Sequence, residues 1–140
     1  MSTQSRFQTG PRPKPGKRYY TVSQANAALP YVRRVAEDVR ASYKRALELQ
    51  QRLERPTPGD EPDQIRAAYD AEVERLRRCA EELEAAGIEL KDHQRGLLDF
   101  PAVHQGREVL LCWQLGEDAI GHWHETDAGF AGRQDVALLE

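Results

Sequence analysis

Potential metal ligands are concentrated in residues 116–133, near the end of the chain. This segment holds two of the four histidines and one of the two tryptophans. His122 and His124 are two residues apart, so on a β-strand both imidazoles project from the same face. Two nitrogen ligands at that spacing can reach one metal ion, and Glu125 offers a carboxylate oxygen beside them. We therefore predict a divalent-metal site, for an ion such as zinc, with His122, His124 and Glu125 as ligands.

Further polar and aromatic residues are expected to line the same pocket as ligand contacts. They are Asp92, Asp99, Trp113, Glu117 and Arg133. Arg133 follows a segment with glycines at both ends, 129–132, whose backbone N–H groups and guanidinium could hold a small anion. We expect this segment to fold back, so that His124 and Arg133 border one cavity.

Some of these residues have simpler structural interpretations. Trp113 and Trp123 are typical packing residues. The Asp99 carboxylate either accepts bonds from backbone amides or points into the pocket of the histidines. His93 and His104 lie on neighbouring turns and could complete a metal shell.

The face of the sheet that the paired histidines occupy depends on the turn after Leu115. A turn of two or four residues places them on the face of Trp113, and a turn of three or five residues places them on the opposite face. The sequence leaves both arrangements open.

The sequence favours a binding protein over an enzyme. It contains neither a phosphate-binding loop motif nor a Gly-x-Ser-x-Gly nucleophile motif. A hydrolase with His124 as general base, oriented by Glu117 or Asp99, is the less favoured alternative, because no nucleophile is identifiable. A third alternative is a protein–protein interaction module, in which two predicted helices form a homodimer or dock a partner.

Composition and charge restrict the partners and the compartment. The chain has 140 residues, 31% of them charged, and a mean hydropathy of −0.75. Its apolar run at 109–113 is far too short to span a membrane. Residues 1–18 lack the apolar region of a secretory signal, so we expect a cytoplasmic protein. Cys79 and Cys112 are 33 residues apart, which fits neither a zinc clip nor a disulfide scaffold, and both are predicted core residues.

The net charge of −3 is unevenly distributed. Residues 1–36 contain seven basic residues and no acidic one, and the remainder has 13 basic against 23 acidic residues. A basic arm on an acidic body is compatible with nucleic-acid binding. We nevertheless expect no nucleic-acid partner, because no basic patch with interleaved aromatic residues is present.

Prolines, caps and apolar periodicity divide the chain into a disordered, basic, Pro-rich arm over 1–18, a single α+β domain over 19–134 and a C-terminal tail over 135–140. Thr21 and Gln24 form a capping-box pattern, with Ser23 as a competing N-cap. Pro30 predicts a short helical turn over 23–28, followed by a helix of roughly 25 residues that opens at Pro30.

A second apolar stripe precedes Gly87, and the two helices are predicted to form an antiparallel hairpin joined by residues 55–62. After Gly87 the pattern changes to strands. They are expected at 88–90, 97–100, 107–115 and 120–125, with Pro101 ending the second and a turn at 105–106. The fold class is therefore α+β, a long antiparallel helical hairpin packed with a small antiparallel β-sheet.

Several motifs together resemble those of a known family. They are Tyr20-Thr21-Val22, Gly87–Asp92, Gly96–Pro101, Cys112-Trp113, Trp123-His124-Glu125 and Gly129–Arg133. Over about residues 19–134 the chain resembles a bacterial family of small proteins known as domain of unknown function 2203. This resemblance implies an intracellular bacterial protein without an assigned activity, and it favours His124 over His122 and His93 as a motif residue.

Overall fold

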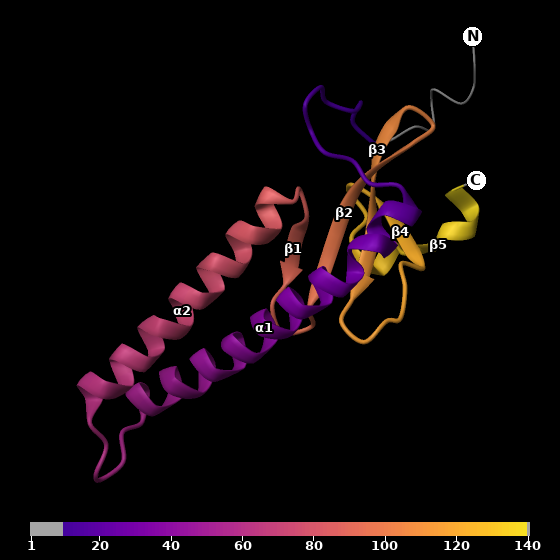
Figure 1. The fold of residues 1–140 in the computed structure, drawn as a ribbon. Coiled ribbons are helices and arrows are strands. Elements are labelled where there is room, and N and C mark those ends of the chain that lie inside the picture. Colours follow the sequence, from indigo (N-terminus) through magenta and orange to yellow (C-terminus); the bar gives the residue numbers. More distant parts are fainter. Residues whose placement is uncertain (1–9, 140) are drawn as a thin grey trace.

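The computed structural model describes residues 10–139 and shows a helical hairpin beside a twisted antiparallel sheet (Figure 1). The predicted α+β class and the predicted hairpin are confirmed. In chain order the elements are α1 (Val22–Glu54), α2 (Pro62–Ala85), β1 (Glu89–Asp92), β2 (Leu97–His104), β3 (Arg107–Gln114), β4 (His122–Glu125), the 3-10 turn η2 (Phe130–Gly132), β5 (Gln134–Asp135) and the 3-10 turn η3 (Val136–Leu139).

The capping box at the start of α1 is confirmed, and Thr21 rather than Ser23 is the N-cap. The Thr21 hydroxyl accepts a bond from the Gln24 backbone N–H at 3.0 Å, and the Gln24 side chain accepts one from the Thr21 N–H at 3.0 Å. Two backbone donors that lack helical partners are thereby satisfied at once. The first turn of α1 is fixed where it meets the sheet.

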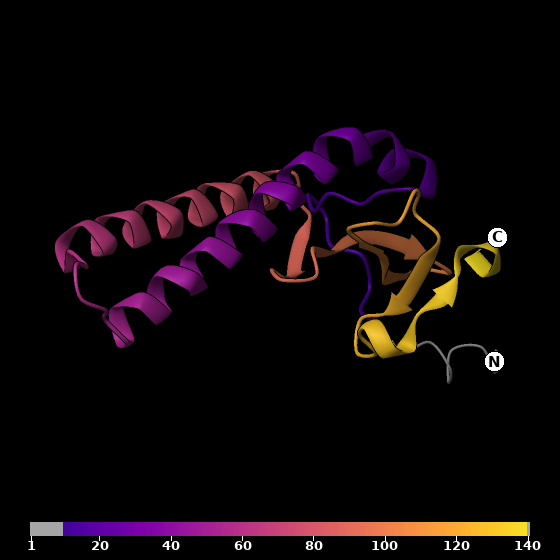
Figure 2. The same ribbon diagram turned by 90° about the horizontal axis from the view of Figure 1, so that it is seen from below.

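The prediction that the long helix begins at Pro30 is wrong, because α1 is continuous over its 33 residues and Pro30 lies inside it. Proline removes one helical hydrogen bond and pushes its ring against the carbonyl of Asn26, which bends a helix without necessarily ending it. Figure 2 shows that α1 changes direction between its first part, over the sheet, and the part that runs beside α2. One helix therefore serves both the sheet and the hairpin.

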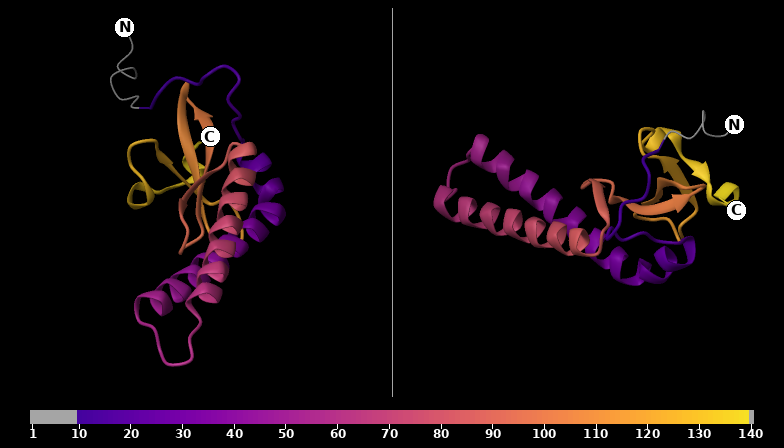
Figure 3. Two further views of the ribbon diagram at one scale, coloured as in Figure 1. Left: turned by 90° about the vertical axis from the view of Figure 1, so that its left-hand side faces the viewer. Right: turned by 90° about the horizontal axis from the view of Figure 1, so that it is seen from above.

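The two helices pack against each other along their apolar faces. The connection between them lies at the end of the hairpin that projects away from the sheet (Figure 3). Helix α2 begins with Pro62 after Glu61, which makes no side-chain capping bond. The Asp60 carboxylate accepts the backbone N–H of Thr57 at 2.9 Å within the connection. Helix α2 is terminated by Gly87, as predicted, with a left-handed φ of 75°.

Within the described residues the sheet has five antiparallel strands in the order β1-β2-β3-β4-β5. The prediction that Pro101 ends the second strand is wrong, since β2 continues to His104. The carbonyl of Pro101 accepts a bond from the Tyr20 N–H at 2.7 Å, on the side of β2 where β1 has already ended. A missing N–H on that side breaks no bond to β3, so proline is tolerated there.

The two faces of the sheet are covered by different parts of the chain. Phe100, Leu111 and Trp113 face the helices and belong to the main apolar core, together with Val32 and Leu83 of the hairpin. The opposite face carries Asp99, Cys112 and His124, which are also buried. Figure 2 shows α1 on one side of the sheet and the yellow segment around η2 on the other.

Residues 10–18 and 134–139 lie against the body of the protein. Glu108 of β3 donates its backbone N–H to the Pro11 carbonyl at 2.7 Å, and its carboxylate accepts bonds from Lys17 at 2.8 Å and the Tyr19 hydroxyl at 2.9 Å. At the other end, β5 pairs with β4, and Val136 packs against the apolar core. Residues 1–9 of the predicted arm lie outside the described residues.

In the part of the chain that the structure describes, neither helix combines the length and the apolar character that a membrane crossing requires.

The capping box yields a prediction with an internal control. Thr21→Ala removes the hydroxyl that accepts the Gln24 N–H, so we expect the free energy of unfolding to fall by about 1 kcal/mol. Ser23→Ala, two residues away and equally exposed, should change it by less than about 0.5 kcal/mol. Urea unfolding followed by circular dichroism measures both. Equal losses for the two variants would contradict the assignment of Thr21 as the cap.

Candidate metal centre

The register of three strands brings the polar residues of the second face together. Asp99 of β2 lies opposite Cys112 of β3, and Cys112 lies opposite His122 of β4. His124 lies opposite Leu110, one diagonal step from Cys112. Side chains alternate along a strand, so the histidines face the side opposite Trp113. The loop between β3 and β4 is longer than the turns considered from the sequence, and the register rather than the turn length determines the face.

Three side chains of metal-ligating type converge on this face. Asp99, Cys112 and His124 are 2%, 1% and 2% exposed, and one potential ligand atom from each lies within 4.8 Å of the other two. Nε2 of His124 lies 3.2 Å from Oδ1 and 3.1 Å from Oδ2 of Asp99. A carboxylate oxygen, a thiol sulfur and an imidazole nitrogen therefore surround one buried point.

The orientation of the His124 ring is fixed by a hydrogen bond at Nδ1, the ring nitrogen that does not face Asp99. Its Nδ1 lies 2.7 Å from the Glu125 carbonyl, which can only accept, so Nδ1 carries the hydrogen and donates it. Glu125 itself is fixed by Arg107, whose Nε donates to its carboxylate at 2.9 Å. This arrangement leaves Nε2 as the nitrogen directed at Asp99.

The arrangement differs from a Cys-His-Asp catalytic relay. Such a relay needs one ring nitrogen at the nucleophile and the other at the carboxylate. Here Asp99 occupies Nε2 and a backbone carbonyl occupies Nδ1. Neither nitrogen remains to take the proton of the Cys112 thiol. The geometry suits three donors that share one ion better than it suits nucleophilic catalysis.

Without a metal, the pair Asp99–His124 is a buried ion pair. The hydrogen bond that His124 Nε2 donates to the Asp99 carboxylate, followed by an interaction with Cys112, raises the pKa of His124 from 6.5 to about 10, although burial alone would lower it. The imidazolium is therefore the stable form in the folded metal-free protein at neutral pH. In this form a proton occupies Nε2, the atom that a metal would need.

A small cavity of about 160 Å³ opens onto Asp99 and His124. It is bordered on one side by Lys91 of β1 and on the other by Thr126, Gly129 and Phe130, which follow β4. Gly129 has φ 65° and ψ −166°, a conformation available essentially to glycine alone. A tight turn at Gly129 therefore brings Phe130 back over the centre.

Arg133 lies next to this cavity without being one of its lining residues. Its guanidinium stacks 4.6 Å from the centroid of the Phe130 ring and donates to Glu117 at 2.7 Å and to the Cys112 carbonyl at 3.1 Å. The glycine-containing segment thus folds back so that Phe130 lines the cavity, and Arg133 stacks on Phe130. Burial raises the pKa of Glu117, but Arg133 and the Gln114 N–H outweigh this effect and hold the pKa below its usual value.

The other sequence-predicted site residues lie outside the centre. Trp113 is on the helix face, where its indole N–H donates to the Glu117 carbonyl at 3.0 Å. The Asp92 carboxylate accepts the Arg95 backbone N–H in the turn after β1. His122 is half-exposed, with Nδ1 3.8 Å from Glu117. Glu125 contributes its carbonyl to His124 while Arg107 holds its carboxylate.

His93 and His104 do not complete the centre. His93 stacks on Tyr43 with ring centroids 5.3 Å apart, and His104 lies against Trp123 at 5.5 Å. Both imidazoles therefore pack on aromatic rings.

Sequence reasoning missed Cys112 as a functional residue. Both cysteines are buried, as predicted, and Cys79 lies in the main apolar cluster. Cys112 instead faces the polar side of the sheet, between Leu111 and Trp113, which face the helices. Strand alternation was the available signal, because it sends Cys112 to the face opposite Trp113.

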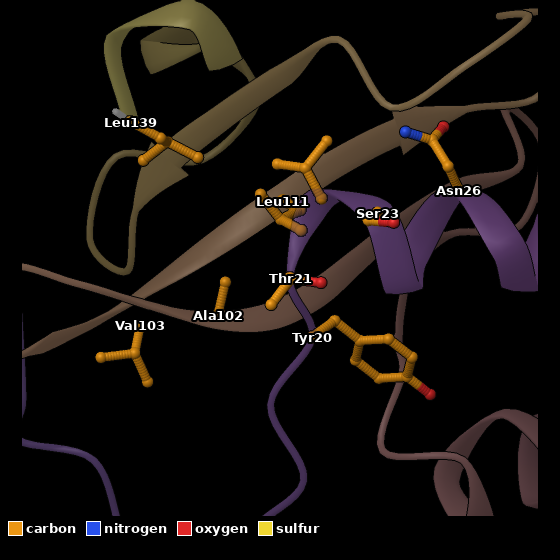
Figure 4. A pocket seen from close by; sticks show the side chains of 9 residues that line it. Tyr20, Thr21, Ser23, Asn26, Ala102, Val103, Leu111 and Leu139 are labelled. Carbon is orange, nitrogen blue, oxygen red and sulfur yellow. The ribbon is translucent and has the colours of Figure 1, made fainter.

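A wider hollow of about 750 Å³ lies beside the N-terminus of α1 (Figure 4). Tyr20, Thr21 and Asn26 line one part of it, and Val103 and Leu139 line another. Its lining residues include no histidine, cysteine, carboxylate or cationic side chain. We therefore place the candidate site at the buried centre.

Comparison with known proteins identifies the family. Residues 18–136 match the profile of a family described as an uncharacterized conserved protein (DUF2203), and the chain belongs to this family. The resemblance predicted from the motifs is thereby confirmed. Neither the curated proteins nor the solved structures contain a significant match.

The ion pair predicts a pH-dependent stability for the metal-free protein. Because folding raises the pKa of His124 from 6.5 to about 10, its contribution is fully present below pH 6.5 and is lost as pH rises through 10. We expect about 4 kcal/mol less stability at pH 10 than at pH 6.5 from this residue. Urea unfolding with a chelator present measures the difference.

Variants separate this contribution from those of other titrating groups. His124→Gln should flatten the pH dependence, whereas His122→Gln, at the half-exposed histidine of the same strand, should retain it. If both variants kept the wild-type slope, His124 would not be the responsible group.

Proposed function

We propose that this member of the DUF2203 family binds a divalent transition metal, preferentially zinc, through Asp99, Cys112 and His124. The observation that supports the proposal is the convergence of three buried ligating side chains from three neighbouring strands, with their donor atoms within 4.8 Å. Exposed acidic clusters are common on protein surfaces, but this set is buried and mixes three kinds of donor. The predicted set of His122, His124 and Glu125 is replaced in the proposal because the His122 and Glu125 side chains point to other partners.

The donor set matches the chemistry of zinc. Zinc is bound by thiolate, imidazole and carboxylate at about 2.0–2.3 Å, usually with four ligands in a tetrahedral arrangement. Tetrahedral donors at those bond lengths lie about 3.3–3.8 Å apart. His124 and Asp99, at 3.1 Å, need to separate only slightly to share an ion. Three protein ligands leave one position open for a water or another small ligand.

The second shell of the centre supports the same interpretation. A metal-bound histidine typically donates its other ring N–H to a carbonyl or carboxylate, which fixes its tautomer and orientation. The Glu125 carbonyl does this for His124. The Cys112 carbonyl is in turn bonded by Arg133. Hydrogen bonds outside the centre therefore help to position two of the three proposed ligands, His124 and Cys112.

Metal loading of the untagged protein tests the proposal. We expect about one equivalent of zinc or cobalt per chain, with a near-ultraviolet charge-transfer band for cobalt bound to a thiolate. Cys112→Ser should abolish the band, and Asp99→Asn and His124→Ala should lower the affinity at least about tenfold. His122→Ala is the matched control and should bind as the wild type does. A wild type without metal affinity, or equal losses for His122→Ala and His124→Ala, would refute the proposal.

A second candidate function is self-association through the helical hairpin. A shallow hollow of about 650 Å³ on α1 is lined by Glu37, Arg40, Tyr43, Lys44 and Leu47, with Leu47 39% exposed. An antiparallel copy of α1 that crosses near Arg40 would place Glu37 of each copy opposite Lys44 of the other. The hollow lies along the middle of α1, beside Gln94 of the turn after β1.

Light scattering tests this dimer directly. The wild type should have the mass of a dimer at micromolar concentration, and Leu47→Glu should convert it to a monomer because a charge replaces the exposed apolar side chain that lines the hollow. Leu138→Glu, at an exposed leucine near the C-terminus, should leave the mass unchanged. A monomeric wild type would eliminate the dimer.

A further inference from the structure

We infer that the centre takes a short-chain carboxylate as an additional ligand, with the carboxylate on the open metal position and the carbon end against Leu97, Leu110 and Phe130. This inference rests on the proposed metal site and adds the class of its ligand. It is derived from the size of the adjoining cavity, the cation at its border and its apolar wall.

The size of the cavity restricts the ligand. Water occupies about 30 Å³ per molecule in the liquid, so a volume of about 160 Å³ holds about five waters. A carboxylate with one to three further carbon atoms fits such a space, whereas a nucleotide or a peptide segment is far too large. The exposed residues of the lining are Lys91 and Gly129, so the cavity opens to solvent beside them.

Charge favours an anion. The two negative charges of Asp99 and a Cys112 thiolate would balance a divalent ion, which leaves Lys91 as the cation in the cavity lining. The Lys91 ammonium donates to Glu89 at 2.8 Å and is attracted by Asp99. Ammonium has three donors, so the pair with Glu89 leaves two for a ligand. A bound metal would neutralise the charge of Asp99 and so remove its attraction for Lys91. An anionic ligand would replace that attraction.

The rest of the lining determines the kind of anion. Leu97, Leu110 and the Phe130 ring contribute an apolar wall, while the Thr126 hydroxyl offers one hydrogen bond. Bicarbonate and phosphate carry polar groups on every side, so their oxygen atoms would contact the apolar wall without a hydrogen-bond partner. An aliphatic carboxylate instead presents a charged end to the metal and Lys91, and a methyl or ethyl group to the wall. The guanidiniums of Arg95 and Arg133 lie 4.1 Å and 4.6 Å from the centroid of the Phe130 ring and hold it in place.

The test uses the full chain loaded with cobalt, whose visible spectrum reports a change in its ligands. Acetate, propionate, bicarbonate and the neutral analogue acetamide are titrated at constant ionic strength. We expect saturable spectral changes with acetate and propionate, tighter binding of propionate, and no change with acetamide. Lys91→Gln should weaken acetate binding by about fivefold, the effect of one partly exposed ion pair.

Arg75→Gln provides the matched control, because Arg75 is an exposed cation on α2 that pairs with Glu72. It should bind acetate as the wild type does. If cobalt fails to bind at all, the proposed metal site itself is refuted. If cobalt binds but acetate leaves the spectrum unchanged, or Lys91→Gln and Arg75→Gln bind acetate equally, only the carboxylate inference is overturned. Tighter binding of bicarbonate than of propionate would likewise overturn the choice of an aliphatic ligand.

Discussion

Burial of the Asp99 carboxylate is the constraint on which the second face of the sheet depends. A charged carboxylate that is 2% exposed and unpaired would be destabilising by several kcal/mol. The carboxylate is paired with His124, whose Nε2 lies within 3.2 Å of both oxygens, and the orientation of His124 is fixed in turn by the Glu125 carbonyl. This pairing requires β2, β3 and β4 in one particular register. A shift of one residue would send either Asp99 or His124 into the apolar core.

The two faces of the sheet are covered by layers of different thickness, which follows from the placement of Asp99 and His124 on one face. The apolar face is covered by α1, whose bend at Pro30 also allows it to pair with α2. Among the described residues, the polar face around Asp99 and His124 is covered by the short segment after β4, with its turn at Gly129 and the Phe130 ring at the cavity. A thin cover leaves a buried polar group within reach of solvent molecules, which a second helical layer would prevent. The fold thus combines a helical layer over the apolar face with a polar face that small solvent molecules can reach.

The elements that local chemistry determines were predictable. The capping box at Thr21, the apolar stripes of the hairpin and the left-handed Gly87 each depend on residues close in sequence. The continuity of α1 through Pro30 was not predictable in this way, because it depends on whether the rest of the helix compensates for one lost hydrogen bond. The passage of β2 through Pro101 depends on where a neighbouring strand ends, which its own sequence does not record.

The candidate site was predictable only in part, for a similar reason. Asp99 and His124 were recognised by their side-chain types, but their contact depends on the pairing of β3 with two other strands. Cys112 was assigned to the core because it stands between apolar residues in a buried strand. Its neighbours Leu111 and Trp113 do fill the core, so composition suggested the wrong face for the residue between them. Side chains alternate along a strand, so once Trp113 is known to face the helices, Cys112 must face the opposite side of the sheet.

The combination of Asp, Cys and His has a physical consequence for a buried metal site. In the metal-free protein the Asp99 carboxylate and the His124 imidazolium cancel, and a Cys112 thiol adds no charge. A divalent ion would displace the proton of His124 and the thiol proton, and the two anionic ligands would again cancel the charge. Neither state then buries a net charge, so the same fold can accommodate both. A serine at position 112 would break this symmetry, because a hydroxyl keeps its proton and the bound ion would carry an uncompensated positive charge.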